Sequence, residues 1–268
     1  MAVSFEFKEK YTISDLLEIM RLLRTPEGCP WDREQTHESI RSNLLEETHE
    51  ALEAIDRGDM PLLQEELGDV LLQVLLHSRM EEEAGRFDLD DVADAACKKL
   101  IFRHPHVFGS AAAASGEEAL DVWDAAKRTE KGQKTTAEAM ASVPENLPAL
   151  WRAEKMQSKA AKAGFEWPDV GCAVDKLREE TEELAAAVAE GDADHIAEEL
   201  GDTLFAAVKV GRFCGADPEA ALHRCCEKFL RRFSATEAVC AQHGENMAEL
   251  PISELERRYR EAKNSEKD

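Results

Sequence analysis

The sequence contains little of what β-structure requires. Among its 268 residues, aromatic side chains account for only 6%, and there are just 14 glycines and 9 prolines. Runs in which β-branched and polar residues alternate are nearly absent, whereas alanine, leucine and glutamate, which favour helices, dominate. We therefore predict an all-α protein, and the hydrophobic content of 43% is typical of a globular chain.

The chain also lacks any long apolar run. The stretch from Val70 to Leu76 is far shorter than the roughly 20 residues that a membrane helix needs, and the charged segment 1–10 does not resemble a signal peptide. The seven cysteines include no CxxC pair, so we expect reduced thiols rather than a disulfide framework. These features predict a cytoplasmic protein that has no membrane partner.

Positive charge is scarce as well. The 33 lysines and arginines are outnumbered by 56 acidic residues, which gives a formal net charge of −23. Such a surface repels nucleic acid polymers and anionic lipid, so a general nucleic-acid-binding protein is excluded. A nucleotide substrate stays compatible with this charge, because a bound divalent cation can reverse the local sign.

One acidic pattern occurs twice, 133 residues apart. We call Glu47, Glu50, Glu66 and Asp69 the N-terminal quartet, and Glu180, Glu183, Glu199 and Asp202 the C-terminal quartet. The flanking segment EELGD is identical at 65–69 and 198–202. A repeat of this length predicts two similar domains, which we place at 1–110 and 135–268, with a linker that contains a short helix at 111–134.

The spacing within each quartet predicts that its members meet. Residues three apart share a helix face, and each quartet is symmetric about a glycine, Gly58 or Gly191. In an antiparallel helix hairpin that turns at Gly58, Glu47 would face Asp69. Two carboxylates about 4 Å apart repel by roughly 4 kcal/mol at an effective dielectric constant of 20, so the arrangement needs a cation. Hard oxygen ligands suit Mg²⁺, with Mn²⁺ as a possible substitute.

The acidic pattern has two other interpretations. A single Glu-x-x-Glu is ordinarily a solvated helix face, but two hairpin-related pairs that are duplicated in register favour a metal site. The sequence Glu46-x-x-His49 resembles half of a di-iron site. However, the facing helix offers no second Glu-x-x-His, and the other copy has Glu179-x-x-Glu182. We therefore favour a site for Mg²⁺.

Basic and aromatic residues near the quartets are candidates for binding an anionic substrate. The pairs Lys99 and Arg103, and Lys228 and Arg232, are four apart on the helix after each hairpin, and Lys176 precedes Glu180 by four. They can clamp phosphate oxygens or be ordinary surface cations. Trp31 and Trp167 precede the acidic helices and either stack on a base or anchor loops in the core, and Tyr259 is a weaker stacking candidate. There is no Walker loop and no GxGxxG motif.

These segments resemble the MazG family of nucleoside triphosphate pyrophosphohydrolases over nearly the whole chain. The resemblance rests on GCPWDREQTHESI at 28–40, EELGDVLLQVLLH at 65–77, KLIFRHPHVFG at 99–109 and the second acidic copy. It implies two MazG-like helical-bundle domains in tandem, Mg²⁺ dependence, a homodimer, and hydrolysis of NTPs or dNTPs to the monophosphate and pyrophosphate, as in nucleotide-pool housecleaning.

The resemblance also implies roles for individual residues. The resemblance implies that the C-terminal domain is the principal catalytic one, as in other two-domain members. On this basis the C-terminal quartet would bind Mg²⁺. Lys176, Lys228 and Arg232 would then hold the phosphates, and Tyr259 would replace an aromatic residue, often tryptophan, near the base. We expect Glu179 or Glu180 to act as the base that activates water. The N-terminal quartet is equally intact, which gives no reason to call that domain inactive.

Two alternatives remain open at this point. One is a more selective relative within the same superfamily, which acts on dUTP or phosphoribosyl-ATP. The other is a helical regulatory module that binds nucleotide without turnover.

Overall fold

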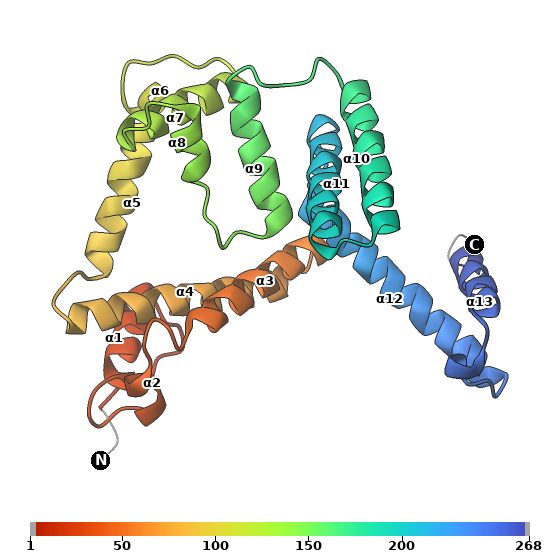
Figure 1. Ribbon diagram of the computed structural model, residues 1–268. Coiled ribbons are helices and arrows are strands. Elements are labelled where there is room, and N and C mark those ends of the chain that lie inside the picture. Colours follow the sequence, from red (N-terminus) through yellow and green to blue (C-terminus); the bar gives the residue numbers. More distant parts are fainter. Residues whose placement is uncertain (1–3, 266–268) are drawn as a thin grey trace. The chain divides into compact units, whose positions relative to one another are not determined.

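The computed structural model describes residues 4–265, and these residues form helices and connecting loops with no β-strand, which confirms the all-α prediction (Figure 1). The chain divides into two compact units. Unit 1 extends to Lys127 and unit 2 begins at Arg128. None of the helices in the described part of the chain is long and apolar enough to span a membrane.

Unit 1 is built around a pair of long helices. Its helices are α1 (Ile13–Leu23), α2 (Pro30–Glu34), α3 (Arg41–Arg57), α4 (Met60–Glu83), α5 (Leu89–Arg103), α6 (Pro105–Phe108) and most of α7 (Gly116–Glu130). Helices α3 and α4 form an antiparallel hairpin, and α1 and α5 pack against α4. The buried core of this unit lies between α1, α4 and the loop before α3, where Met20, Ile40 and Leu75 are at most 5% exposed.

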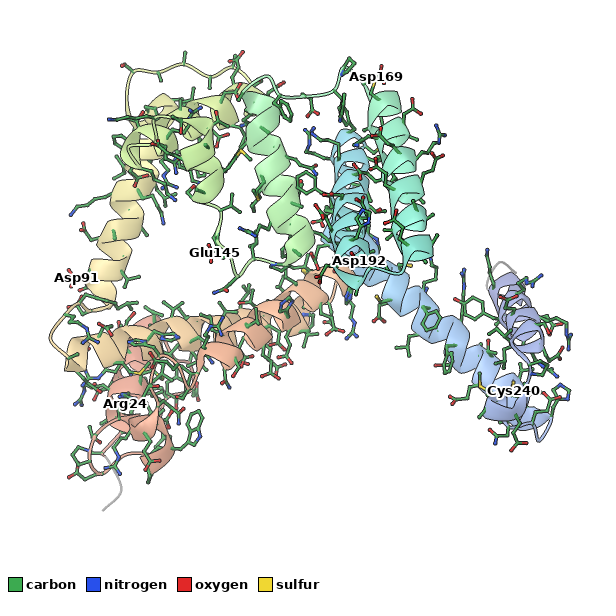
Figure 2. The ribbon with its side chains drawn as sticks, viewed as in Figure 1. Arg24, Asp91, Glu145, Asp169, Asp192 and Cys240 are labelled. Atoms are coloured by element: carbon green, nitrogen blue, oxygen red, sulfur yellow. The ribbon has the colours of Figure 1, made fainter. Side chains whose placement is uncertain are left out.

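Unit 2 repeats the hairpin. It contains α8 (Thr136–Ala141), α9 (Ala149–Lys162), α10 (Val170–Glu190), α11 (Ala193–Phe213), α12 (Pro218–Gln242), a 3₁₀ turn (Met247–Glu249) and α13 (Ile252–Ser265). Helices α10 and α11 form the hairpin, α9 packs on α11, and α13 packs on α12. Figure 2 shows Asp169 and Asp192 at the starts of α10 and α11, where each carboxylate accepts hydrogen bonds from the first backbone N–H groups.

Each hairpin turns at the glycine that the sequence predicted. Gly58 ends α3 with φ = 66°, and Gly191 ends α10 with φ = 78°, both in the left-handed region. A side chain is disfavoured there because its Cβ approaches the following carbonyl oxygen. The aspartate after each glycine, Asp59 or Asp192, then caps the next helix. The turn is therefore encoded by two residues, and it sets the register of the two helices.

Two helices begin within segments whose composition is typical of loops. Segment 25–32 contains two prolines and a glycine, yet α2 begins at Pro30, since proline is well accommodated in the first helical turn. Segment 109–120 is rich in small residues, yet α7 begins at Gly116, where Ser115 Oγ accepts a hydrogen bond from Glu118 N. Helix α8 was not predicted, although Thr135 and Glu138 form a capping box at its start.

A polar cluster joins α4 to the loop before α3 in unit 1. The ring nitrogens His37 Nδ1 and His77 Nδ1 are 2.6 Å apart, and His37 Nε2 is 2.5 Å from Glu81 Oε1. Glu81 is 5% exposed and is also bound by Arg86. Hydrogen bonds from Arg86 and then His37 lower the pKa of Glu81 from 4.5 to about 2.

We predict that Gly191→Ala destabilises unit 2 by about 1–2 kcal/mol, because alanine must adopt a left-handed backbone conformation there. The space around Gly191 is open, so no steric overlap adds to this cost. Gly191→Asn should lose less, since asparagine tolerates this conformation better. Urea unfolding measures both free energies, and equal losses for the two variants would contradict the explanation.

We also predict that Glu81→Gln weakens unit 1 at neutral pH but not in strong acid. Because the pKa of Glu81 is depressed in the folded state, its contribution is present above about pH 4.5 and is lost as the pH falls toward 2. The difference in unfolding free energy between the variant and the wild type should therefore shrink over that interval in urea titrations at a series of pH values. Glu53→Gln is the control, because the exposed pair of Glu53 and Arg57 contributes little at any pH.

Candidate functional site

Both hairpins bring three carboxylates together. In unit 1 these are Glu47, Glu66 and Asp69, and in unit 2 they are Glu180, Glu199 and Asp202; we call them the N-terminal and C-terminal trios. Within each trio, one oxygen of every residue lies within 4.8 Å of the others. The fourth member of each quartet, Glu50 or Glu183, is not part of the group.

The carboxylates are in surroundings that disfavour negative charge. The pKa of Glu47 is raised by burial and then by the charge of Asp69. The pKa of Glu66 is raised by burial and then by Glu50 and Asp69. In unit 2, burial and the nearby carboxylates raise the pKa of Glu183, although Lys176 opposes this effect. Negative charge is therefore opposed at Glu47 and Glu66 in unit 1 and at Glu183 in unit 2.

The residues fit a hard divalent cation. Every ligand atom on offer is a carboxylate oxygen, which Mg²⁺ and Mn²⁺ both prefer. In addition, Glu66 Oε2 is buried and has no hydrogen-bond partner. Such an orphaned oxygen is costly in a folded protein unless a ligand satisfies it. A metal ion bound to the trio would satisfy this oxygen and offset the repulsion.

In unit 2 a threonine fixes the two helices at the height of the trio. Thr203 Oγ1 lies 2.9 Å from the carbonyl oxygen of Glu199 on its own helix and 3.2 Å from that of Glu180 on α10. The residue 133 positions earlier is Val70, which has no hydroxyl. The link between the hairpin helices is thus specific to unit 2.

A lysine faces the C-terminal trio. Lys176 Nζ lies 2.8 Å from Glu180 Oε1 and 2.6 Å from Glu179 Oε1. Hydrogen bonds to Glu179 and Glu180 raise the pKa of Lys176 above its ordinary value, so its ammonium group stays charged. In unit 1 the corresponding position is Asn43, which carries no charge.

His195 is a neighbour of the trio that the sequence analysis missed. Its Nε2 lies 3.2 Å from Glu199 Oε1, and its Nδ1 lies 3.1 Å from Glu190 Oε2. The hydrogen bond to Glu190, followed by nearby negative charge, raises the pKa of His195. The first-half counterpart is Leu62, so this residue gave no signal in the repeat.

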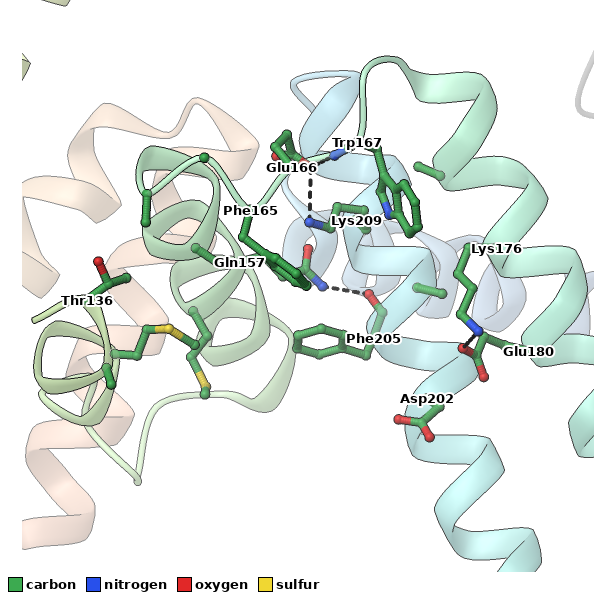
Figure 3. Close-up of a pocket in the computed structure, with 18 residues that line it drawn as sticks. Thr136, Gln157, Phe165, Glu166, Trp167, Lys176, Glu180, Asp202, Phe205 and Lys209 are labelled. Atoms are coloured by element: carbon green, nitrogen blue, oxygen red, sulfur yellow. Dashed lines mark hydrogen bonds and ion pairs between the residues drawn. The ribbon is translucent and has the colours of Figure 1, made fainter.

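A cavity of about 670 Å³ opens beside the C-terminal trio, between α8, α9, α10 and α11 (Figure 3). Lys176, Glu180 and Asp202 line one part of it. Its remaining walls are largely apolar and include the aromatic rings of Phe165, Trp167 and Phe205. The sequence analysis named Trp167 but missed the two phenylalanines, whose positions carry Cys29 and Leu72 in the first half.

The matching region of unit 1 is filled by its core. Leu72 and Leu76 stand where Phe205 and Lys209 line the cavity of unit 2. Leu76 is 6% exposed and belongs to the same cluster as Met20, against which Leu72 packs. The two units therefore share the carboxylate hairpin but differ in the space beside it.

The other candidate substrate-binding residues lie outside the lining of this cavity. Lys228 and Arg232 are on α12, and Tyr259 is on α13 with its ring centroid 5.9 Å from that of Phe229. In unit 1, Lys99 is exposed, and Trp31 lies on α2 with 57% of its surface exposed. The guanidinium of Arg103 is 5.2 Å from the centroid of the Trp123 ring.

Comparison with known proteins agrees with the duplicated hairpin. The family model of the MazG nucleotide pyrophosphohydrolase domain matches residues 35–108 and 173–235, one segment in each unit. The chain is 43% identical over 259 residues to the nucleoside triphosphate pyrophosphohydrolase of Escherichia coli K12, covering 96% of this chain and 98% of the relative.

Two further relatives span most of this chain. It is 41% identical to the nucleoside triphosphate pyrophosphohydrolase/pyrophosphatase MazG of Thermotoga maritima, covering 93% of this chain and 94% of that protein. It is also 42% identical to the uncharacterized protein YabN of Bacillus subtilis, covering 96% of this chain but 53% of that protein. With two matched segments and full-length relatives of this similarity, the chain belongs to the MazG family of nucleotide pyrophosphohydrolases.

Proposed function

We propose that the protein hydrolyses nucleoside triphosphates to the monophosphate and pyrophosphate, using a divalent cation held by the carboxylates of unit 2. The observation that carries this proposal is the cavity that combines aromatic walls with Lys176, Glu180 and Asp202. Aromatic rings suit a nucleobase, and a cation together with an ammonium group suits phosphates. The names of the relatives from Escherichia coli and Thermotoga maritima support the same reaction.

The residues of this chain divide the work in the following way. Glu180, Glu199 and Asp202, with Glu183 beside them, hold the cation, for which Mg²⁺ is our choice and Mn²⁺ a substitute. When bound, the cation neutralises phosphate charge and lowers the pKa of a bound water. Glu179 or Glu180 accepts the proton of the water that attacks the α-phosphorus. Lys176 bonds to both of these carboxylates, and we propose that it transfers to a phosphate oxygen when substrate arrives.

We assign the main catalytic role to unit 2. Unit 1 has the N-terminal trio, but it has Asn43 in place of Lys176, and core residues occupy the region where unit 2 has its cavity. Metal binding by Glu47, Glu66 and Asp69 would then stabilise unit 1 without turnover. Lys99, Arg103 and Trp31 would have no substrate to hold in that unit.

We propose a homodimer that completes the substrate site. Apolar side chains of the unit 2 hairpin and of α12 are 40% or more exposed, namely Val188, Leu200, Leu204, Phe229 and Phe233. Exposed apolar positions of this number are typical of an interface. A second copy packed on them would bring Lys228, Arg232 and Tyr259 toward a substrate.

We also propose that the enzyme works in the cytoplasm, where exposed thiols such as those of Cys225 and Cys226 stay reduced.

We predict that Asp202→Asn lowers the rate of pyrophosphate release by at least about a hundredfold, because it removes a charged ligand from the cation site. Glu180→Gln should do the same. Asp69→Asn is the matched control in unit 1 and should retain most of the activity.

The same assay, run on a panel of NTPs and dNTPs, separates the alternative functions. Hydrolysis of many members of the panel favours housecleaning, and hydrolysis of dUTP alone favours the selective alternative. Nucleotide binding without pyrophosphate release would support the regulatory module instead.

Chelation should separate the structural and chemical roles of the metal. With EDTA we expect pyrophosphate release to stop and to return when Mg²⁺ is added. Mg²⁺ should also raise the unfolding temperature, because binding to the folded state stabilises it by about 2.7 kcal/mol at a concentration 100 times Kd. The variant Glu66→Gln should reduce this thermal gain in unit 1 without stopping hydrolysis, and an unchanged gain would contradict metal binding there.

A further inference from the structure

The loop between α9 and α10 carries two of the three aromatic rings that line the cavity. Residues Phe165, Glu166 and Trp167 lie in this loop, outside both helices. Phe165 and Trp167 line the cavity, and they are 81% and 45% exposed. Rings on a loop with so much free surface can stack on a base only if something fixes the loop.

The carboxylate of Glu166 makes three contacts that fix this loop. Glu166 Oε1 accepts a hydrogen bond of 2.9 Å from the backbone N–H of Trp167. The same oxygen lies 3.1 Å from Lys209 Nζ, and Oε2 pairs with the guanidinium of Arg212. Lys209 and Arg212 are three apart on α11. Figure 3 shows Lys209 beside Glu166 and Asp202 on the same helix as Lys209. One side chain therefore ties the backbone of Trp167 to the helix of the trio.

The charges of this contact are largely removed from water. The side chains of Glu166, Lys209 and Arg212 are 22%, 13% and 20% exposed. Burial lowers the pKa of both Lys209 and Arg212, which shows that their environment opposes positive charge. Without the carboxylate of Glu166, Lys209 would lose the counter-charge of its ion pair, and Arg212 would keep only the nearby charge of Glu154. Loss of the carboxylate should therefore release the loop rather than leave it in place.

Among the described residues of unit 1, the counterparts of Glu166, Lys209 and Arg212 form no such arrangement. In the aligned sequences GCPW and GFEW, Pro30 takes the place of Glu166, and Leu76 takes the place of Lys209. Arg79, at the position of Arg212, pairs with Glu82 and Glu83 instead. The ion pairs of Glu166 thus occur in the one unit whose loop borders the aromatic cavity.

We propose that Glu166 is a positioning residue that holds Phe165 and Trp167 in place for the base of the nucleotide, so that it sets affinity for the nucleoside rather than the rate of the chemical step. This inference rests on the proposed function and deepens it by dividing the site into two ends. The trio and Lys176 serve the phosphates, whereas Glu166, Lys209 and Arg212 serve the base through the loop.

The test is Glu166→Gln, assayed with ATP and Mg²⁺. We expect KM for ATP to rise about tenfold, because binding must then supply the free energy of ordering the loop. The value of kcat should stay within about twofold. Inorganic tripolyphosphate has no base, so its inhibition constant against ATP should not change. Circular dichroism melting checks that the variant is folded.

Two further variants keep the proposal falsifiable. Lys209→Met leaves the side-chain length and removes one ion pair, so it should raise KM in the same direction but less. Glu83→Gln is the matched control: it breaks the ion pair with the largely buried Arg24 in unit 1 and should leave KM unchanged. A parallel rise in the inhibition constant of tripolyphosphate, a fall in kcat at constant KM, or an unchanged KM in Glu166→Gln would each overturn the proposal.

A binding measurement separates this proposal from the hydrolysis reaction. Calorimetry with Mg²⁺ and α,β-methylene-ATP, which resists cleavage at the α–β bond, reports affinity without turnover. Weaker binding by Glu166→Gln supports the positioning role even if the wild type releases no pyrophosphate, a result that would overturn the proposed function alone. Equal binding by the variant and the wild type would overturn the positioning role.

Discussion

Mutual repulsion of carboxylates is the constraint on which the rest of this structure depends. Each hairpin holds three of them with oxygens within 4.8 Å of one another, and burial adds to the unfavourable energy of Glu47, Glu66 and Glu183. A fold keeps such a group only where the helices are firmly joined and a cation can offset the charge. The glycine turns and the aspartate caps that follow them provide that connection in both units.

The two units have the same carboxylate hairpin but different side chains beside it. In unit 1 the space beside the trio is taken by leucine and methionine side chains of the core. In unit 2 the corresponding positions are occupied by Phe205 and Lys209, and both residues line the cavity. The charged Lys176 and the cross-helix hydrogen bond of Thr203 to the carbonyl oxygen of Glu180 are also found only at the unit 2 positions. Duplication supplied two carboxylate hairpins, and our proposal that unit 2 holds the nucleotide depends on the differences among their neighbours.

Ion pairs in unit 2 connect parts of the site that are distant in sequence. Lys176 contacts the trio within one helix, whereas Glu166 reaches across to α11 and restrains the loop that carries Phe165 and Trp167. Residues at both ends of the cavity therefore contact or belong to the same helix, α11, which carries Glu199 and Asp202 as well as Lys209. In the function that we propose, this common helix would keep the phosphate end and the base end at a fixed separation, which a substrate of constant length requires.

The sequence by itself determined the helical class, the duplication and the turn glycines Gly58 and Gly191. It also indicated the carboxylates that meet, although it included Glu50 and Glu183, which lie outside the two trios. Those features depend on local propensity and on fixed helical spacing, so they can be derived from residue numbers alone. Only the tertiary structure decided that Phe205 and Lys209 line a cavity, that Glu166 binds α11, and that Lys228, Arg232 and Tyr259 lie outside that cavity. The physical reason is that these relations depend on side-chain volumes and on packing between helices that are not adjacent in sequence, which no periodicity records.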